Sequence, residues 1–179
     1  MEILNNIYRS CNGLAGVKKL YLFSYVKYPR SSIVVDNNIL TDFPISELYE
    51  FYTIGDVSFT ENITEDDGGK YYDISLSFKT KVFSEALKLV NKDIRAVIQD
   101  NNGNYRLLGN YNGLTCESFN KTTGQSKSDF NGLEFTFSGK ELRESFFFYN
   151  LEVIAGGVNY LLQENGDYLL QENGFRIII

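Results

Sequence analysis

The sequence has 179 residues, of which 22% are charged and 15% aromatic, with a net charge of −6. This length suits one domain with a sizeable core, and the composition differs from the low-hydrophobicity, high-charge pattern of disordered chains. The acidic balance, without a cluster of Lys and Arg, argues against a surface that grips phosphate backbones.

The aromatic residues favour strands over helices. There are 13 Tyr and 14 Phe but no Trp, and they accompany many Gly and Asn and only 2 Pro. Aromatic side chains are enriched in strands, and Asn-Gly pairs form tight turns. The composition therefore predicts a mostly β domain.

The first predicted strand covers residues 17–28, with both faces partly covered. Pro29 closes this strand or places it at a sheet edge. Residues 30–52 have no sustained period, so we expect an excursion from the core, an arm or loop that touches a neighbour. Within it, residues 33–35 fit a short strand, and residues 46–51 fit either a helical turn or a strand.

Strand alternation resumes over residues 56–61 and again over 71–80. The second segment alternates polar residues with three apolar ones, Ile74, Leu76 and Phe78. This period of two is typical of a strand with one buried and one solvated face. The polar and acidic residues 62–70 between the two strands predict a mobile hairpin loop.

The period then changes over residues 83–92, where apolar side chains recur at spacings of three and four. This pattern predicts a short helix with Ser84 as its N-cap. Its apolar stripe comprises Phe83, Ala86, Leu87 and Val90. Strand period returns at Ile94, Ala96 and Ile98. A turn at 100–104 and a return strand at 105–111 complete a predicted hairpin.

Further strands are expected over residues 114–120, 133–138 and 144–154, with an open polar loop over 121–131. In the last of them the phenylalanines should alternate between faces, with Phe146 and Phe148 opposite Phe147.

The end of the sequence contains a duplication. Residues 160–166 recur identically as residues 168–174, and Phe-Arg-Ile-Ile-Ile follows. Each copy predicts a short strand and an Asn-Gly turn. Apolar segments of this kind are either buried within their own domain or dock onto a neighbouring subunit as an added strand. We therefore divide the chain into a β domain over 1–159 and an appendage over 160–179. The subunit-contact candidates are Tyr160, Leu161, Leu162, Tyr168, Leu169, Leu170, Phe175, Ile177, Ile178 and Ile179.

No catalytic constellation is recognisable in the sequence. It contains no His, no Gly-rich phosphate loop and no nucleophile elbow. The acidic run 65–67 fits a solvated loop, and the residues 100–104 fit a turn better than a calcium loop. Cys11 and Cys116 are most simply reduced thiols. We expect neither a secretory signal nor a membrane span. We predict a protein that is not an enzyme, with no catalytic residue, no cofactor and no metal.

Residues 91–114 resemble a segment of virion proteins from tailed phages that infect Bacteroidetes. That segment has a helix, an apolar strand, an Asp/Asn-Gly turn, a Tyr-x-Leu-Leu-Gly return strand and an Asn-Gly-Leu turn. Residues 122–141 are similar to the next hairpin of those proteins, and residues 16–22 to their first strand. The doubled Leu-Leu-Gln-Glu-Asn-Gly tail resembles the C-terminal ends of several phage structural proteins. The resemblance covers most of the chain in patches and includes no catalytic motif.

This resemblance implies the tail-tube fold, a β-sandwich or barrel with one flanking helix. It implies a structural protein of the virion tail that forms homo-oligomeric rings, hexameric by analogy, which stack into a conduit for DNA ejection. The loops at 30–52 and 61–70 would reach adjacent rings. The implied partners are further copies of the chain and other tail or neck proteins. DNA would pass without specific binding, and no membrane or small-molecule substrate is implied. Assembly would take place in the cytoplasm of the bacterial host.

Two other functions fit the same residues. The appendage leaves open a terminator, ring or adaptor protein at one end of the tube. A β-sandwich binding module for glycan or protein would use Tyr71, Tyr72 and Tyr105 as stacking platforms, although cross-strand packing explains these residues equally well.

Overall fold

The computed structural model describes residues 15–155, apart from 45, 46, 67, 82–85, 125, 127 and 128. It contains a seven-stranded sheet of order β2-β3-β11-β8-β7-β1-β4 and a four-stranded sheet of order β5-β6-β10-β9. The strands are β1 Val17–Ser24, β2 Val34–Asp36, β3 Ile39–Asp42, β4 Tyr49–Phe51, β5 Ser58–Asp66, β6 Gly69–Thr80, β7 Ile94–Asp100, β8 Tyr105–Leu108, β9 Thr115–Thr122, β10 Gly132–Glu141 and β11 Phe146–Phe148. The helical elements are η1 Arg30–Ser32, η2 Leu87–Leu89 and α2 Glu152–Ala155.

The first core lies between the two sheets. Phe78 of β6 stacks on Phe135 and Phe137 of β10, with ring centroids 5.4 and 6.0 Å apart. Ile74, Leu76 and Phe78 are all buried here, so the period of two predicted for 71–80 is confirmed. The members of this core are Leu20, Leu22, Val57, Ile74, Leu76, Phe78, Ala86, Ile94, Ala96, Ile98, Leu108, Leu114, Leu133, Phe135 and Phe137.

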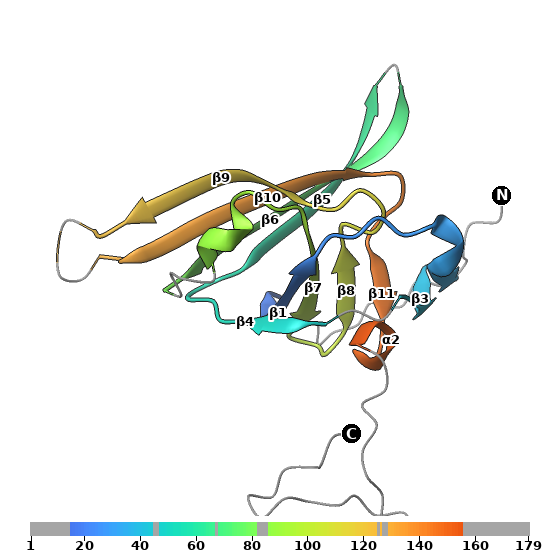
Figure 1. Cartoon of the computed structure of the whole chain (residues 1–179), viewed down its shortest axis with the longest axis horizontal. Helices are drawn as coiled ribbons and strands as arrows, with labels where there is room; N and C mark the ends of the chain where they lie inside the picture. The colour runs from blue at the N-terminus through green and yellow to red at the C-terminus, as the bar shows by residue number, and fades with distance from the viewer. Residues whose placement is uncertain are drawn as a thin grey trace, which may run out of the picture.

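A second core covers the other face of the seven-stranded sheet. It includes Tyr21 and Phe23 of β1, Val97 of β7 and the buried Ile154 of α2. The helix α2 lies below the strands of this sheet in Figure 1. The remaining members are Ile33, Leu40, Phe43, Leu107, Phe146 and Phe148. The first five residues of β7 are therefore buried on both faces. The expected alternation of the phenylalanines at 146–148 is confirmed.

Residues 30–52 are not an excursion from the core. Leu40 and Phe43 are 1% and 2% exposed within the second core. β3 pairs in parallel with β11, through Phe147 and Ile39, and the 46–51 region contributes strand β4 at the edge of the same sheet. Very short strands paired with distant segments carry too few residues to display a period, which explains why the sequence pattern failed here.

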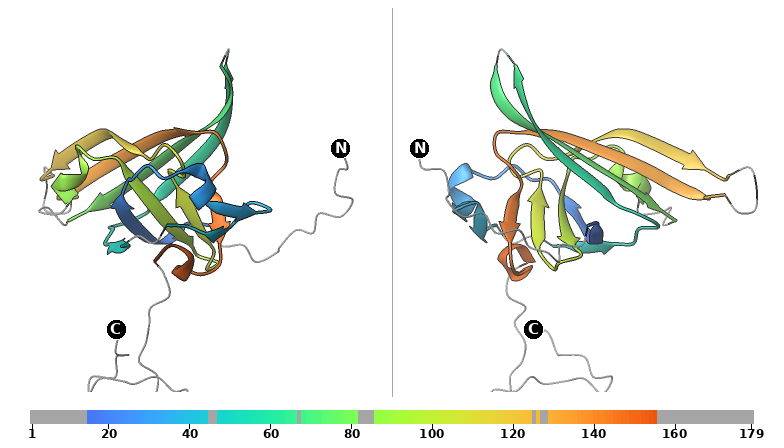
Figure 2. Two further views of the ribbon diagram at one scale, coloured as in Figure 1. Left: turned by 45° about the vertical axis from the view of Figure 1, so that its right-hand side comes forward. Right: turned by 180° about the vertical axis from the view of Figure 1, so that it is seen from behind.

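The region expected as a loop over 62–70 is mostly strand. β5 and β6 stay paired as far as Asp66 and Gly69, so the turn is much shorter than expected. Figures 1 and 2 show this hairpin projecting past the body, while the β9–β10 hairpin extends in another direction. A projecting hairpin is solvated on both faces, so its polar side chains look like those of a loop.

Two other expectations change in length or type. β1 ends at Ser24, not at residue 28, and the strand expected over 144–154 is β11 followed by the short helix α2. Asn150 lies just before that helix, and its side-chain oxygen accepts a hydrogen bond from the Glu152 amide at 3.1 Å.

The predicted helix at 83–92 is only partly within the described residues. Ala86 is buried as expected, and the 3-10 turn η2 follows it. Leu87 is 46% exposed, so its place on the apolar stripe was wrong. A 3-10 turn has three residues per turn, which rotates Leu87 off that stripe. Phe83 and Ser84 lie outside the described residues. The overall prediction of a mostly β fold with one short helical segment is confirmed.

Candidate functional site

The outer face of the four-stranded sheet is lined by small polar side chains. Each of these residues is paired across the sheet with another polar one, for example Thr60 with Ser75 and Ser77 with Thr136. The residues that alternate with them along the same strands point inward and contribute to the first core. We call this surface the hydroxyl face, and it comprises Ser58, Thr60, Asn62, Asp73, Ser75, Ser77, Lys79, Ser118, Asn120, Glu134, Thr136, Ser138 and Lys140.

The hydroxyl face carries charges of both signs. Two carboxylates and two ammonium groups belong to it, and Glu117 of β9 adds a third carboxylate, because it lines a hollow on this face beside Asp73 and Lys140. Lys79 bridges to Glu134 across the strands at 2.6 Å. The hydrogen bond from Lys79 lowers the pKa of the Glu134 carboxyl. Lys140 lies over the ring of Tyr71, with its nitrogen 4.5 Å from the centroid. The face is therefore hydrated, with no cluster of cations that would hold phosphates.

Both edges of this sheet are open in the described part of the chain. β5 and β9 are its end strands, and each pairs with a neighbour on one side. The unpaired backbone amides and carbonyls of an edge strand are a template for pairing with another chain. The hydroxyl face thus lies between two edges that can both accept a strand.

The most deeply buried charge is Arg95, in the middle of β7. Its guanidinium donates hydrogen bonds to the carbonyls of Val26, Gly109 and Asn110 at 2.8, 3.0 and 3.4 Å. It also lies over the rings of Tyr25, Tyr28 and Phe43, at 4.5, 5.0 and 5.4 Å from the centroids. Burial lowers the pKa of Arg95. Its donors hold backbone carbonyls from two loops, which is a structural role.

Glu141, at the end of β10, is buried near Arg95. One of its oxygens accepts hydrogen bonds from the amides of Tyr111 and Asn112 at 2.9 and 2.8 Å. Burial raises the pKa of the Glu141 carboxyl, although these amides and the charge of Arg95 act in the opposite direction. Within the described residues, its second oxygen and the side-chain oxygen of Asn110 are buried without a hydrogen-bond partner. Glu141 fixes the 109–113 loop through these amide bonds.

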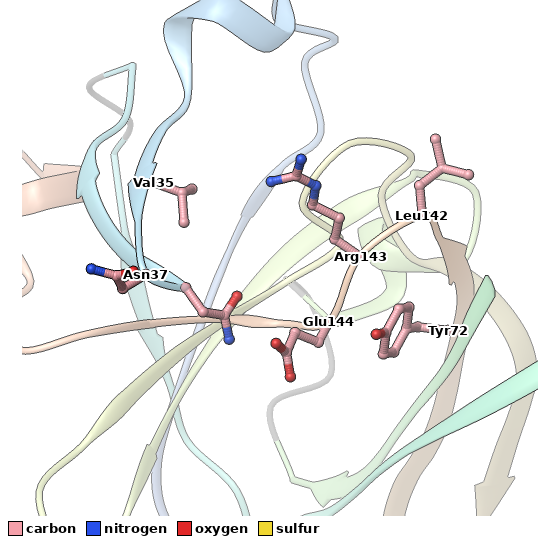
Figure 3. A pocket seen from close by; sticks show the side chains of 7 residues that line it. Val35, Asn37, Tyr72, Leu142, Arg143 and Glu144 are labelled. Atoms are coloured by element: carbon pink, nitrogen blue, oxygen red, sulfur yellow. The ribbon is translucent and has the colours of Figure 1, made fainter. Parts of the chain in front are cut away.

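A surface hollow of about 290 Å³ separates the β2–β3 turn from the turn after β10. Figure 3 shows Val35 and Asn37 on one side and Arg143 and Glu144 on the other, with Tyr72 of β6 nearby. The labelled side chains do not converge on a common point, so the hollow offers no nucleophile or acid–base pair.

A larger groove, of about 420 Å³, lies between β4, the end of β1 and the η2 turn. We call it the β4 groove. Four of its lining residues belong to the first core or pack against it, namely Leu22, Phe51, Leu89 and Ile94. Its other lining residues are Phe23, Ser24, Tyr49, Glu50, Tyr52, Lys88 and Lys92. One end of the core therefore reaches the surface in this groove.

The sequence-predicted subunit-contact residues, from Tyr160 to Ile179, lie outside the described residues, as does Cys11. Cys116 is a free thiol, and burial raises its pKa.

Asp100 accepts hydrogen bonds from the amides of Asn102 and Asn104 at 2.8 and 2.9 Å, so the turn interpretation of 100–104 is confirmed. Glu65 and Asp66 are exposed at the hairpin tip.

The tyrosines considered as stacking platforms are half-buried. Tyr105 stacks on Phe148 with ring centroids 5.4 Å apart, which is packing within the second core. Tyr71 contacts Lys140, and Tyr72 lines the hollow in Figure 3.

Two signals in the sequence could have indicated features that the sequence analysis missed. The alternation of Ser and Thr in β6 and β10 is a signal of the hydroxyl face. The charge of Arg95 within an apolar run is a signal of a buried cation. The β4 groove has no local signal, because it joins segments far apart in the sequence.

In the described part of the chain, no group of three or more His, Cys, Asp or Glu side chains is placed to hold a metal ion. The same residues include no helix long and apolar enough to cross a bilayer. Comparisons with family models, with curated proteins and with solved structures gave no match to this chain.

Proposed function

We propose that this chain is a structural protein of a tailed-phage virion, a tail-tube or tail-tube-like ring subunit that forms a conduit for DNA ejection. The observation that supports it best is the hydroxyl face lying between two open strand edges. If β9 of one copy paired with β5 of the next, the four-stranded sheets would join into one continuous wall. The core already covers one face of each sheet, so the hydroxyl face would line the inside.

The chemistry of the hydroxyl face suits such a lumen. Short neutral side chains keep a wall hydrated, and a face without a cluster of cations does not hold phosphates. DNA could then pass without specific binding. The net charge of −6 for the whole chain supports the same view, because the chain as a whole has no excess of cations.

The projecting hairpins support contacts between rings. The β5–β6 hairpin extends past the body in Figure 1, and its Ile63 is 66% exposed. A projecting strand pair with an exposed apolar side chain is suited to contact with an adjacent ring. The appendage at 160–179 would add further subunit contacts.

The first test is the mass of the purified full chain, measured by native mass spectrometry and light scattering over a range of concentrations. Rings or growing polymers are the expected result. Electron microscopy of these particles should show a central channel. A strict monomer at all concentrations would favour a binding module, and ligand screens would follow.

The edge pairing has its own test, in proline substitutions at Asn120 and Lys121 of β9. Along an antiparallel edge strand, the amide of one residue points to its partner strand and the next points to the open side. Proline at the open-side position keeps the fold but removes a bond to the next copy, so assembly should be lost without a change in thermal unfolding. Proline at the other position should destabilise the domain. Two folded variants that both assemble normally would contradict the proposed edge pairing.

A second candidate, the binding module, is favoured by one observation. Tyr49 and Tyr52 are 63% and 67% exposed beside the β4 groove, a suitable arrangement for stacking on a sugar ring. A monomeric chain with saturable glycan binding that is lost on Tyr52→Ala would support this function instead.

A further inference from the structure

We propose that a hollow beside Tyr149 is a binding site for a neutral saccharide. We call it the Tyr149 hollow. Its volume is about 380 Å³, and it is lined by Asn37, Asn38, Ile39, Asn104, Phe147, Phe148 and Tyr149. Sites for small ligands measure about 300–1,000 Å³, so the hollow is within their range. The inference is independent of the proposed function, because it concerns a ligand and not the contacts between subunits.

Three segments that lie far apart in the sequence form the hollow. β3 pairs with β11 through Ile39 and Phe147, which brings the β2–β3 turn to the end of β11. On the other side of β11, Phe148 pairs with Tyr105, so Asn104 of the β7–β8 turn lies next to the same end. Figure 1 shows the end of β11 and the β7–β8 turn together at the lower edge of the seven-stranded sheet. The walls of the hollow are therefore held by strand pairing.

Tyr149 offers an aromatic ring to a ligand. Its side chain is 75% exposed. It directly follows Phe148, which is buried and stacks on Tyr105, so the backbone that carries the exposed ring is anchored in the second core. An anchored tyrosine presents a flat apolar face with little loss of conformational entropy, which suits the C–H groups of a sugar ring.

The β2–β3 turn supplies amide groups. Asp36 pairs with Ile39, so Asn37 and Asn38 form a two-residue turn, and both have positive φ, 48° and 66°. The Asn38 carbonyl accepts a hydrogen bond from the Phe147 amide at 3.2 Å, which holds the turn against β11. Asn suits the left-handed backbone of such a turn, but the turn does not use the side chains. Neither side-chain amide has a hydrogen-bond partner within the described residues, so both can donate to and accept from a ligand.

Asn104 adds an oriented acceptor. Its backbone amide and its side-chain nitrogen donate hydrogen bonds to the two carboxylate oxygens of Asp100, at 2.9 and 3.0 Å. These two bonds fix the side chain and occupy its nitrogen. The side-chain oxygen of Asn104 is therefore the atom that can accept a hydrogen bond from a ligand hydroxyl.

The chemistry of the lining selects a neutral ligand with many hydroxyl groups. None of the seven lining residues is charged, so the hollow has no partner for a phosphate or a carboxylate. Arg106 of β8 lies over the Phe147 ring, 3.7 Å from its centroid, and does not line the hollow. A peptide could not extend the sheet here, because β11 lies between β3 and β8. A sugar offers C–H groups to the Tyr149 ring and hydroxyl groups to the asparagines.

Saturation-transfer difference NMR on the full chain tests the inference, because the method detects sugar binding to monomers and to large assemblies alike. The probes are glucose, galactose, mannose and N-acetylglucosamine, each titrated to about 50 mM. At least one of them should give a saturable signal with a Kd of about 1 mM. No saturable signal from any of the four would overturn the inference.

Substitutions in the full chain locate the bound sugar. Tyr149→Ala should weaken binding about tenfold, whereas Tyr149→Phe, which keeps the ring, should retain most of it. Asn38→Gly removes the amide and keeps the left-handed turn, so it should weaken binding about fivefold. Thermal unfolding should be unchanged in all three variants. The control Leu142→Ala, at a site 53% exposed outside the hollow, should bind like the unmodified chain.

Tyr52→Ala separates the two exposed aromatic sites. If this variant loses sugar binding while Tyr149→Ala and Asn38→Gly keep it, the sugar binds in the β4 groove and the inference is wrong. The mass of the same samples separates the inference from the proposed function. Rings that bind no sugar overturn this inference alone, and a monomer that binds sugar through Tyr149 supports it without supporting the conduit.

Discussion

Arg95 shows how one residue can connect segments that lie far apart in the sequence. Its donors reach Val26 beyond β1 and the 109–110 carbonyls after β8, and three aromatic rings cover its cation. A buried guanidinium of this kind is stable only while its bonds are satisfied, because desolvation opposes the charge. We infer that it fixes the chain as it leaves β1 against the 109–113 loop.

Replacing Arg95 should therefore destabilise the domain strongly. We expect Arg95→Met to lower the free energy of unfolding by about 3–5 kcal/mol, because three carbonyls lose their buried donor. Arg95→Lys should recover only part, since an ammonium group cannot reproduce the planar fork. Urea denaturation measures both. Arg143→Met, at an exposed position, is the control and should change stability by less than about 0.5 kcal/mol. Equal effects at 95 and 143 would contradict this role.

Glu141 should make stability depend on pH. Because its pKa is raised in the folded state, the folded chain retains a proton that the unfolded chain releases. The contribution of this carboxyl to stability is therefore fully present below the ordinary Glu value of 4.5 and is lost as the pH rises through the native pKa. In Glu141→Gln, the side-chain carbonyl can still accept the two amide bonds, and the titration is gone.

The measurement is the unfolding free energy of both proteins from pH 4 to pH 8. The variant should gain stability relative to the unmodified chain as the pH rises, by up to about 1.4 kcal/mol for each pKa unit of the shift. Asp100 has a lowered pKa, because its hydrogen bonds outweigh its burial, but it titrates in both proteins and cancels in the difference. A difference that does not vary with pH would refute the assignment to Glu141.

At the scale of elements, the 109–113 loop is packed against the segment that follows β1. Gly113 has φ of +78°, and a Cβ built on it would lie 2.8 Å from the ring of Tyr25. Tyr25 in turn donates a hydrogen bond to the Tyr111 carbonyl at 2.6 Å and lies under the Arg95 cation. The absence of a side chain at 113 is therefore required for the close approach of the two segments.

We expect Gly113→Ala to destabilise the domain by about 2–4 kcal/mol, the sum of left-handed backbone strain and a displaced Tyr25 ring. Gly55→Ala is a matched control, because Gly55 has φ of +70° and a Cβ added there would meet no atom within 4 Å. The control should cost only the backbone contribution, about 1–2 kcal/mol. Thermal unfolding compares the two. Equal losses would show that the contact with Tyr25 is unimportant.

The β5–β6 hairpin gives a prediction about assembly alone. Ile63 is 66% exposed near the end of the hairpin and opposite Tyr72. Ile63→Ser should leave thermal unfolding within about 0.5 kcal/mol, because an exposed side chain contributes little to folding. Under the proposed function it should reduce the growth of stacked rings, measured by light scattering. Val26→Ser, at a site 51% exposed on the body, is the control. Unchanged polymer growth would remove the hairpin from the ring contact.

At the scale of the whole molecule, the domain and the appendage should separate in function. Deletion of 160–179 is expected to abolish assembly while the domain stays folded, because residues 20–154 form both described cores. Circular dichroism checks folding, and native mass spectrometry checks assembly. A truncated chain that still forms particles of the original size would count against the appendage as a subunit contact.

The sequence by itself determined the β-rich class and the strands with a long, clean period. Residues 71–80 were predicted in place, because a two-residue alternation reports directly on a sheet with one covered face. The hairpin after residue 94 was also predicted, although its return strand ends at Leu108 and not at residue 111. The alternation at Phe146 to Phe148 was equally readable. The polar alternation of β6 and β10, which forms the hydroxyl face, was also present in the sequence.

Only the tertiary structure decided which segments meet. The placement of β3 beside β11, the environment of Arg95 and the β4 groove all join residues far apart in the chain, and local patterns contain no information on such pairings. The hairpin at 62–70 was mistaken for a loop because strands that leave the body lose the buried face that creates the period. Periodicity reports burial on one side of a strand, whereas the neighbours of that strand are selected by the packing of the whole domain.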